Sequence, residues 1–115
     1  MAEGSRLDLS VSVHETIPVL HVDGDIDMAT APELAAALET HSGGYRSSVL
    51  IDLAGCPFVD SGGLNVLLQA VRQMDGQSWL GVIGPSHNLR RVLEIVGLTS
   101  DPRFRLLDDL SWLCA

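Results

Sequence analysis

Short apolar segments alternate with longer amphipathic segments along most of this chain, and turn residues separate them. Val49–Leu53 is almost entirely apolar, as expected of a strand that is covered on both faces. Residues 61–74 then place apolar side chains at helical spacing, and Trp79–Ile83 is another short apolar strand. Phe104–Leu107 is a weaker last strand. Because strands that alternate with helices form mainly parallel sheets with crossover helices, the sequence predicts an α/β fold.

The beginning of the chain has a different pattern. Residues 7–13 alternate between apolar and polar side chains, which is the period of a half-buried strand. Glu15 and Thr16 indicate a turn, and Ile17–Val22 returns as a second strand. Pro18 has no amide to donate, so we expect this end of the second strand to lie at an edge. The sheet should therefore have four to five strands and begin with an antiparallel hairpin.

Capping residues predict the ends of the helices. Residues 30–33 have the spacing of a capping box, with Thr30 as the N-cap. Ser86 is the expected N-cap of a third helix, and Gly97 suits the left-handed cap at the end of that helix. Asp108 is expected to cap a short terminal helix. No repeat or linker interrupts this pattern, and 115 residues are the usual size of one domain.

The charge of the chain bears on its partners. A formal net charge of -8 repels nucleic-acid phosphates and anionic lipids, so we expect neither nucleic acid nor a membrane as a partner. The apolar runs are too short to span a bilayer, and the N-terminus lacks the pattern of a signal peptide. We therefore expect a cytoplasmic protein. Cys56 and Cys114 have no metal-ligand spacing and are expected to be reduced thiols.

The most informative segment joins the third strand to the second helix. Gly62 and Gly63 fall in the first helical turn, where each glycine costs about 1 kcal/mol relative to alanine. Either a partner or phosphate approaches this backbone closely, or the helix packs tightly against a strand. Ser61 lies beside these glycines at the mouth of the helix. Its simplest interpretation is a helix N-cap.

Three segments carry a resemblance to a known family. Asp60–Leu64 resembles the Asp-Ser-Ser-Gly-Leu signature of STAS domains, the anti-sigma factor antagonist family. Gly24–Leu34 resembles the Gly-Glu-Leu-Asp segment that leads into the first helix of that family, and Arg91–Leu98 resembles its third helix and Gly-Leu stop. The resemblance runs from about Leu7 to about Leu110, so residues 1–115 are expected to form a single STAS domain. It departs from the family pattern at Gly62, where many members have a second serine.

The resemblance implies a function. In that family, an anti-sigma factor with a serine-kinase fold phosphorylates the serine that follows the aspartate, which is Ser61 here. The unphosphorylated antagonist binds the anti-sigma factor and so releases the sigma factor, and a serine phosphatase resets the switch. Asp23 would face the partner or the nucleotide of the kinase. The residues expected to contact the partner are Asp23, Asp25, Thr30, Asp60, Ser61, Gly62, Gly63 and Leu64. A phosphate on Ser61 is expected to face free amides at the positive end of a helix.

Other functions remain open as alternatives. A STAS protein could serve another assembly, such as a lipid-transport complex or a signalling scaffold, through the same surface and without phosphorylation. A hydrolase with Ser61 as its nucleophile would need a base and an oxyanion hole, and Ser61 lacks the pair of glycines that flanks a nucleophile-elbow serine. We therefore expect neither enzyme activity nor a cofactor.

Three alternating aspartates, Asp23, Asp25 and Asp27, resemble the start of a calcium loop. Met28 stands where that loop needs its glycine, and Leu34 stands where it needs its bidentate glutamate. We therefore expect no metal. Asp25 and Asp27 are expected to cap their own loop instead.

Overall fold

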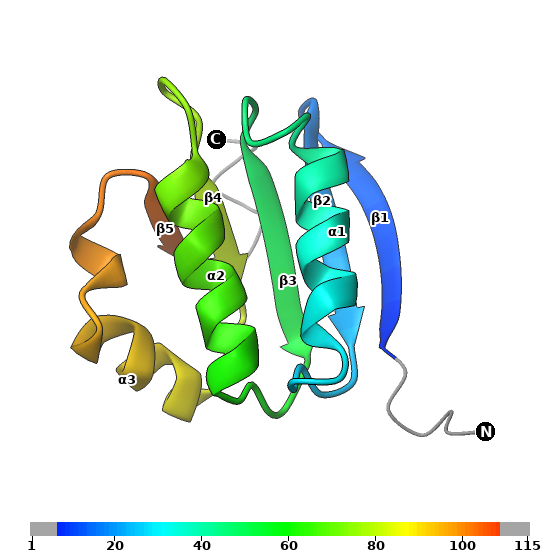
Figure 1. Cartoon of the computed structure of the whole chain (residues 1–115), viewed down its shortest axis with the longest axis vertical. Helices are drawn as coiled ribbons and strands as arrows, with labels where there is room; N and C mark the ends of the chain where they lie inside the picture. Colours follow the sequence, from blue (N-terminus) through cyan, green and yellow to red (C-terminus); the bar gives the residue numbers. More distant parts are fainter. Residues whose placement is uncertain (1–6, 109–115) are drawn as a thin grey trace.

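Five strands form one sheet in the order in which they occur along the chain, β1-β2-β3-β4-β5 (Figure 1). The computed structural model describes residues 7–108. The first two strands are antiparallel, and every later pair is parallel, as the sequence predicts. The strands are β1 (Asp8–His14), β2 (Ile17–Asp23), β3 (Val49–Gly55), β4 (Leu80–Ile83) and β5 (Phe104–Leu107); the helices are α1 (Ala31–His41), α2 (Ser61–Gln73), α3 (His87–Ile95) and the short 3₁₀ helix η2 (Leu98–Ser100). The predicted terminal helix after Asp108 lies outside the described residues.

A two-residue turn fixes the register of the N-terminal hairpin. Glu15 and Thr16 have φ angles of 54° and 72°, the positive values that such tight hairpin turns require. β1 and β2 then pair without interruption from His14 opposite Ile17 to Asp8 opposite Asp23. β2 is an interior strand, but its pairing with β3 begins only at Val19, so Pro18 lies beyond the parallel ladder.

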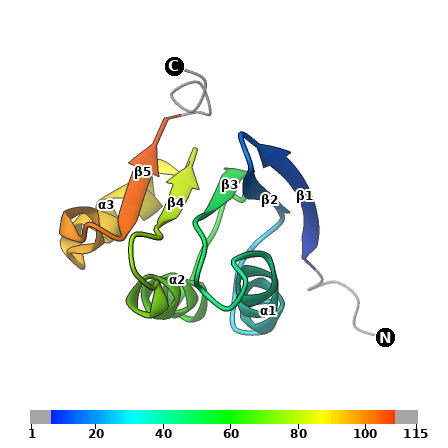
Figure 2. The same cartoon turned by 90° about the horizontal axis from the view of Figure 1, so that it is seen from above.

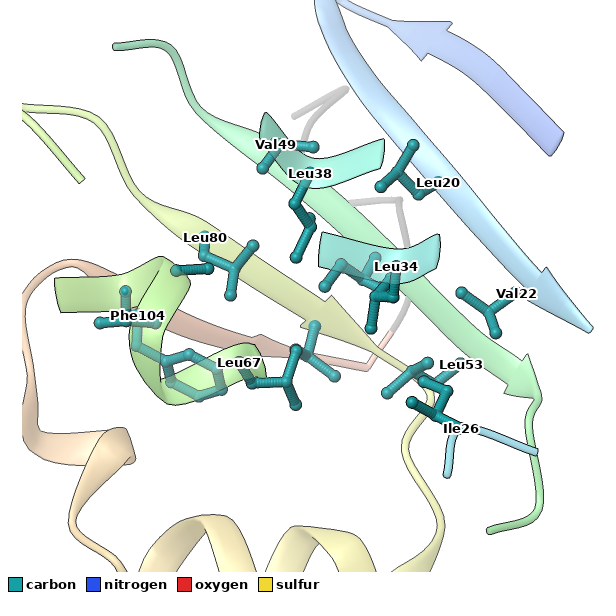
Figure 3. Close-up of a cluster of buried hydrophobic side chains, with 14 of the residues drawn as sticks. Leu20, Val22, Ile26, Leu34, Leu38, Val49, Leu53, Leu67, Leu80 and Phe104 are labelled. Carbon is teal, nitrogen blue, oxygen red and sulfur yellow. The ribbon is translucent and has the colours of Figure 1, made fainter. Parts of the chain in front are cut away.

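Two of the helices, α1 and α2, cover one face of this sheet. Figure 2 shows α1 and α2 side by side against the same face. Their inward side chains, such as Leu34, Leu38 and Leu67, are fully buried against strand residues such as Leu20 and Leu53 (Figure 3). A smaller cluster of Val19, Leu50, Trp79 and Ile83 comes from the alternate strand positions and so lies on the other face. Within residues 7–108, no helix combines the length and the apolar character needed to cross a membrane.

The caps of α3 are as predicted, and Thr30 is the N-cap residue of α1 as predicted, but the side-chain bond of the capping box is absent. The Ser86 side chain accepts a hydrogen bond from the Leu89 amide at 3.2 Å, and Gly97 has a φ of 84°. Thr30 makes no side-chain capping bond to α1, so the predicted capping box is wrong. Its hydroxyl instead accepts from the Asp27 amide and donates to the Asp25 carbonyl. The Thr30 side chain therefore folds back onto the preceding loop, where it cannot reach the helix amides.

Candidate functional site

The loop after β2 and the loop after β3 run side by side at the carboxyl ends of their strands. The Gly24 amide donates to the Gly55 carbonyl, and the Ile26 amide donates to the Phe58 carbonyl, both at 3.0 Å. The Ile26 carbonyl in turn accepts from the Asp60 amide at 3.0 Å. These backbone bonds bring the Gly24–Leu34 segment next to the segment that leads into Asp60–Leu64. Parallel sheets usually bind their ligands at the carboxyl ends of the strands, so we expect the functional surface at this edge.

Asp60 is the residue that joins these two loops to α2. Its Oδ1 accepts from the amides of Gly62 at 2.8 Å and Gly63 at 3.1 Å, and its Oδ2 accepts from the Met28 amide at 3.2 Å. Its backbone is extended, as is usual for an N-cap. Asp60 therefore caps α2, and the interpretation of Ser61 as the N-cap is wrong.

Ser61 is the first residue of α2, and its side chain is exposed. Within residues 7–108, its hydroxyl has no hydrogen-bond partner. The expectation that a phosphate on Ser61 would find free amides needs correction, because the Asp60 carboxylate already binds the amides of Gly62 and Gly63. A phosphate here would compete with Asp60 for the same donors.

The two glycines of α2 serve different purposes. A side chain at Gly63 would place its Cβ 2.5 Å from the Ile26 Cγ2 and 2.8 Å from the Val59 Cγ1. Gly63 is buried, so tight packing of α2 against the two loops explains it. At Gly62 the nearest atoms to an added Cβ would be 3.2 Å and 3.3 Å away, in Asp60 and Met28, which requires only a small adjustment. Gly62 is partly exposed and borders Ser61.

The loop between β2 and α1 is held by its own side chains. Asp27 Oδ1 accepts from the amides of Ala29 at 2.9 Å and Thr30 at 3.0 Å, so Asp27 caps this loop as expected. Among the described residues, Asp25 contributes only its backbone carbonyl to the hydrogen bonds of the loop, so the expectation that its side chain also caps the loop is not met. Thr30 is 1% exposed. Thr30 therefore stabilises the loop, and its side chain is too buried to contact a partner directly.

Asp23 and Asp25 leave their side chains exposed at this edge of the sheet. The Asp23 carboxylate lies over Gly55, where an added Cβ would be 2.6 Å from its Oδ1. Among residues 7–108, no three His, Cys, Asp or Glu side chains gather in a way that could hold a metal ion. The buried Cys56 thiol forms no disulfide within the described part of the chain, and burial is the main reason that its pKa is raised.

An apolar groove of about 340 Å³ opens beside Ser61, between the start of α2 and α3. Phe58 on its rim is 53% exposed, and Val92 is 37% exposed. The residues that line it are Pro57, Phe58, Val59, Asp60, Ser61, Leu64, Ser86, Asn88, Leu89 and Val92. Sequence analysis identified Leu64 but missed Phe58 and Val92, because the groove exists only once α3 has packed beside α2. The one available signal was a large apolar residue, Phe58, in a loop rich in turn-forming residues.

A separate chain of polar side chains crosses the other face of the sheet. His21 Nδ1 lies 2.9 Å from Asp52 Oδ2, and its Nε2 lies 2.8 Å from Ser12 Oγ. These residues stand on β2, β3 and β1, so they connect three neighbouring strands. His21 thus has a structural place in the sheet and forms no hydrogen bond with Ser61.

Comparison with known proteins agrees with this geometry. A family model described as "Mlab, STAS domain" matches residues 9–108. The anti-sigma-F factor antagonist RsfB of Mycobacterium tuberculosis is 28% identical over 110 residues, which cover 96% of this chain and 88% of RsfB. The anti-sigma-B factor antagonist of Listeria monocytogenes is 34% identical over 98 residues, which cover 81% of this chain and 85% of that protein.

The solved structures agree as well. The crystal structure of an anti-sigma factor antagonist from Mycobacterium paratuberculosis superposes with a TM-score of 0.82 at 26% identity, over 99% of this chain and 96% of that one. The family match spans the sheet, the three helices and both loops around Ser61. The chain therefore belongs to the STAS domain family.

Proposed function

We propose that this STAS domain is an anti-sigma factor antagonist, which binds an anti-sigma factor with a serine-kinase fold through the surface around Ser61. The observation that carries the proposal is the exposed Ser61 hydroxyl, which no described residue binds, at the rim of an apolar groove. The relatives named as antagonists of anti-sigma-F and anti-sigma-B factors support the same role.

The groove gives the unphosphorylated protein a surface that suits a protein partner. Phe58 and Val92 expose apolar area in the groove that Ser61 lines, and Met28, which is 74% exposed, borders Gly62. Exposed apolar patches that are bordered by polar residues are typical of interaction sites. The partner would insert an apolar side chain beside the neutral hydroxyl of Ser61.

Phosphorylation of Ser61 would prevent partner binding at this surface by electrostatic repulsion. A phosphate adds about -1.5 to -2 charges at neutral pH. The adjacent Asp60 carboxylate holds the amides of Gly62 and Gly63, so the phosphate meets a negative charge where it would otherwise find donors. Asp23 and Asp25 add further negative charge at the same edge of the sheet. The modified surface therefore repels a partner that was shaped for a hydroxyl, and a serine phosphatase would restore binding.

Binding accounts for this surface better than catalysis does. A serine nucleophile needs a base within hydrogen-bonding distance, and no described residue stands in that relation to Ser61. In this proposal the partner kinase transfers the γ-phosphoryl group of ATP to the Ser61 hydroxyl, and ADP leaves.

Phosphosite mapping with the partner kinase tests the proposal. Incubation with the anti-sigma factor and ATP should add a single phosphate to the wild type, and Ser61→Ala should abolish it. Ser100→Ala removes an exposed hydroxyl on η2 and should be labelled like the wild type. Equal labelling of Ser61→Ala would overturn the assignment. Stable binding to a different assembly, with Ser61 unmodified in cells, would favour the alternative of a STAS subunit in a transport complex or scaffold.

A further inference from the structure

β1 is the outermost strand on its side of the described sheet (Figure 1). It has seven regularly paired residues and contains no proline, glycine or lysine. Edge strands usually carry such residues, or a bulge, because an open edge can pair with another chain. The opposite edge strand, β5, has only four residues and carries Arg105 in its interior. The unprotected edge of this sheet is therefore β1.

The hairpin turn determines which backbone groups β1 presents outward. His14 and Ile17 close the two-residue turn, so they form a hydrogen-bonded pair. Such pairs alternate along an antiparallel ladder, so the amides and carbonyls of Leu9, Val11 and Val13 point away from β2. Pro18 stands opposite Val13, where β2 needs no donor toward β1. Val11 is 43% exposed and Val13 is 70% exposed.

The sequence of β1 is complementary to its own reverse. If two copies of β1 lie antiparallel about a two-fold axis through Val11, then Val11 faces itself and Leu9 faces Val13. These are the three residues whose amides and carbonyls point outward, so each pair exchanges two hydrogen bonds. The polar residues also match, because Ser10 faces Ser12 and Asp8 faces His14 at each end.

We propose that the protein forms a symmetric dimer in which two β1 strands pair antiparallel about Val11 and join the two sheets into one. The same patch serves both copies, so the assembly closes at two subunits. Val11 and Val13 of each copy gain apolar neighbours across the axis. α2 and α3 lie away from β1 (Figure 1). The groove beside Ser61 is lined by α2, by α3 and by the loops that precede them, so the dimer leaves both Ser61 sites accessible. This proposal is independent of the function proposed for Ser61.

Sedimentation equilibrium from micromolar to near-millimolar concentration tests the dimer. The wild type should dimerise. Val11→Lys places two ammonium groups opposite each other on the axis and should weaken dimerisation about tenfold or more. Ser10→Lys adds the same charge to the other face of β1, opposite Ser12, and should dimerise nearly as the wild type does. A wild type that stays monomeric throughout, or a Val11→Lys protein that dimerises like the wild type, would overturn the proposal.

A mixture of two variants tests the register. Val11→Lys and Val11→Glu should each be monomeric alone, and an equal mixture should form a heterodimer, because position 11 then faces an opposite charge. Only an axis through Val11 predicts this rescue, so two folded variants that fail to associate would show that the register is wrong. Circular dichroism establishes that each variant is folded. If Val11→Lys does not fold, Val13→Lys at the more exposed position should also weaken the wild-type dimer, and unchanged dimerisation would exclude the interface.

Discussion

Asp60 is the residue on which the local structure of the site depends most. Its carboxylate accepts hydrogen bonds from Gly62, Gly63 and Met28, so it caps α2 and ties it to the loop after β2. Asp60→Ala would leave these amides without their acceptor. We expect it to lower the free energy of unfolding by about 1–2 kcal/mol, measured by denaturant titration.

Glu33→Ala is the matched control, because it also removes one carboxylate from the start of a helix. Glu33 is exposed on α1, and the capping box that would have required its side chain is absent. Its loss should change the free energy of unfolding by less than about 0.5 kcal/mol. Equal destabilisation by the two substitutions would contradict the role assigned to Asp60.

At the scale of elements, local sequence patterns correctly predicted the features that depend on one short segment of the chain. The apolar run of β3 and the caps at Ser86 and Gly97 depend on neighbouring residues, and the structure confirms them. Thr30 stands at the predicted N-cap position, but its predicted capping bond is absent. Its hydroxyl binds the preceding loop instead, and that loop is held by hydrogen bonds to residues 55–60. The groove beside Ser61 likewise needs α3 against α2. Contacts between distant segments therefore determine the hydrogen bonds of Thr30 and the shape of the groove, and a local sequence pattern does not reveal such contacts.

One such contact joins the end of α2 to the start of β5. Arg103 donates to both carboxylate oxygens of Asp101 and to the Arg72 carbonyl, and these bonds to Arg103 lower the pKa of Asp101. A pKa that is lowered in the folded state stabilises the protein above the usual aspartate range, and this stabilisation is lost as the pH falls through the folded-state pKa. Asp101→Asn should therefore lower the free energy of unfolding at pH 7.

The loss from Asp101→Asn should shrink as the pH is lowered below about 4, where the unfolded aspartate is protonated. Denaturant titrations at several pH values measure how this loss of unfolding free energy depends on pH. A loss from Asp101→Asn that is the same at low and neutral pH would show that the ion pair is not its cause.

At the scale of the whole molecule, the proposed surfaces occupy different parts of one sheet. Ser61 and its groove lie where β3 gives way to α2, and the proposed dimer edge is β1 (Figure 1). The core of α1, α2 and the strands lies between them and is fully buried at residues such as Leu34 and Leu53. Close-packed interiors resist gradual deformation. A change at Ser61 is therefore expected to act on the residues that touch it and to leave the edges of the sheet in place.

This reasoning predicts a local switch. Ser61→Asp should bind the anti-sigma factor at least about tenfold more weakly than the wild type, since about 1.4 kcal/mol gives that factor. Ser100→Asp adds the same charge to an exposed site on η2 and should bind normally. Because Ser61 is already exposed, a phosphate there displaces no core side chain. We expect it to disturb the adjacent Asp60, whose carboxylate binds the amides of Gly62 and Gly63. Amide chemical shifts should therefore change on phosphorylation only in residues 24–30, in residues 56–64 and around Ser86 at the start of α3. Changes that extend to β5 around Phe104 would replace the local mechanism with a global one.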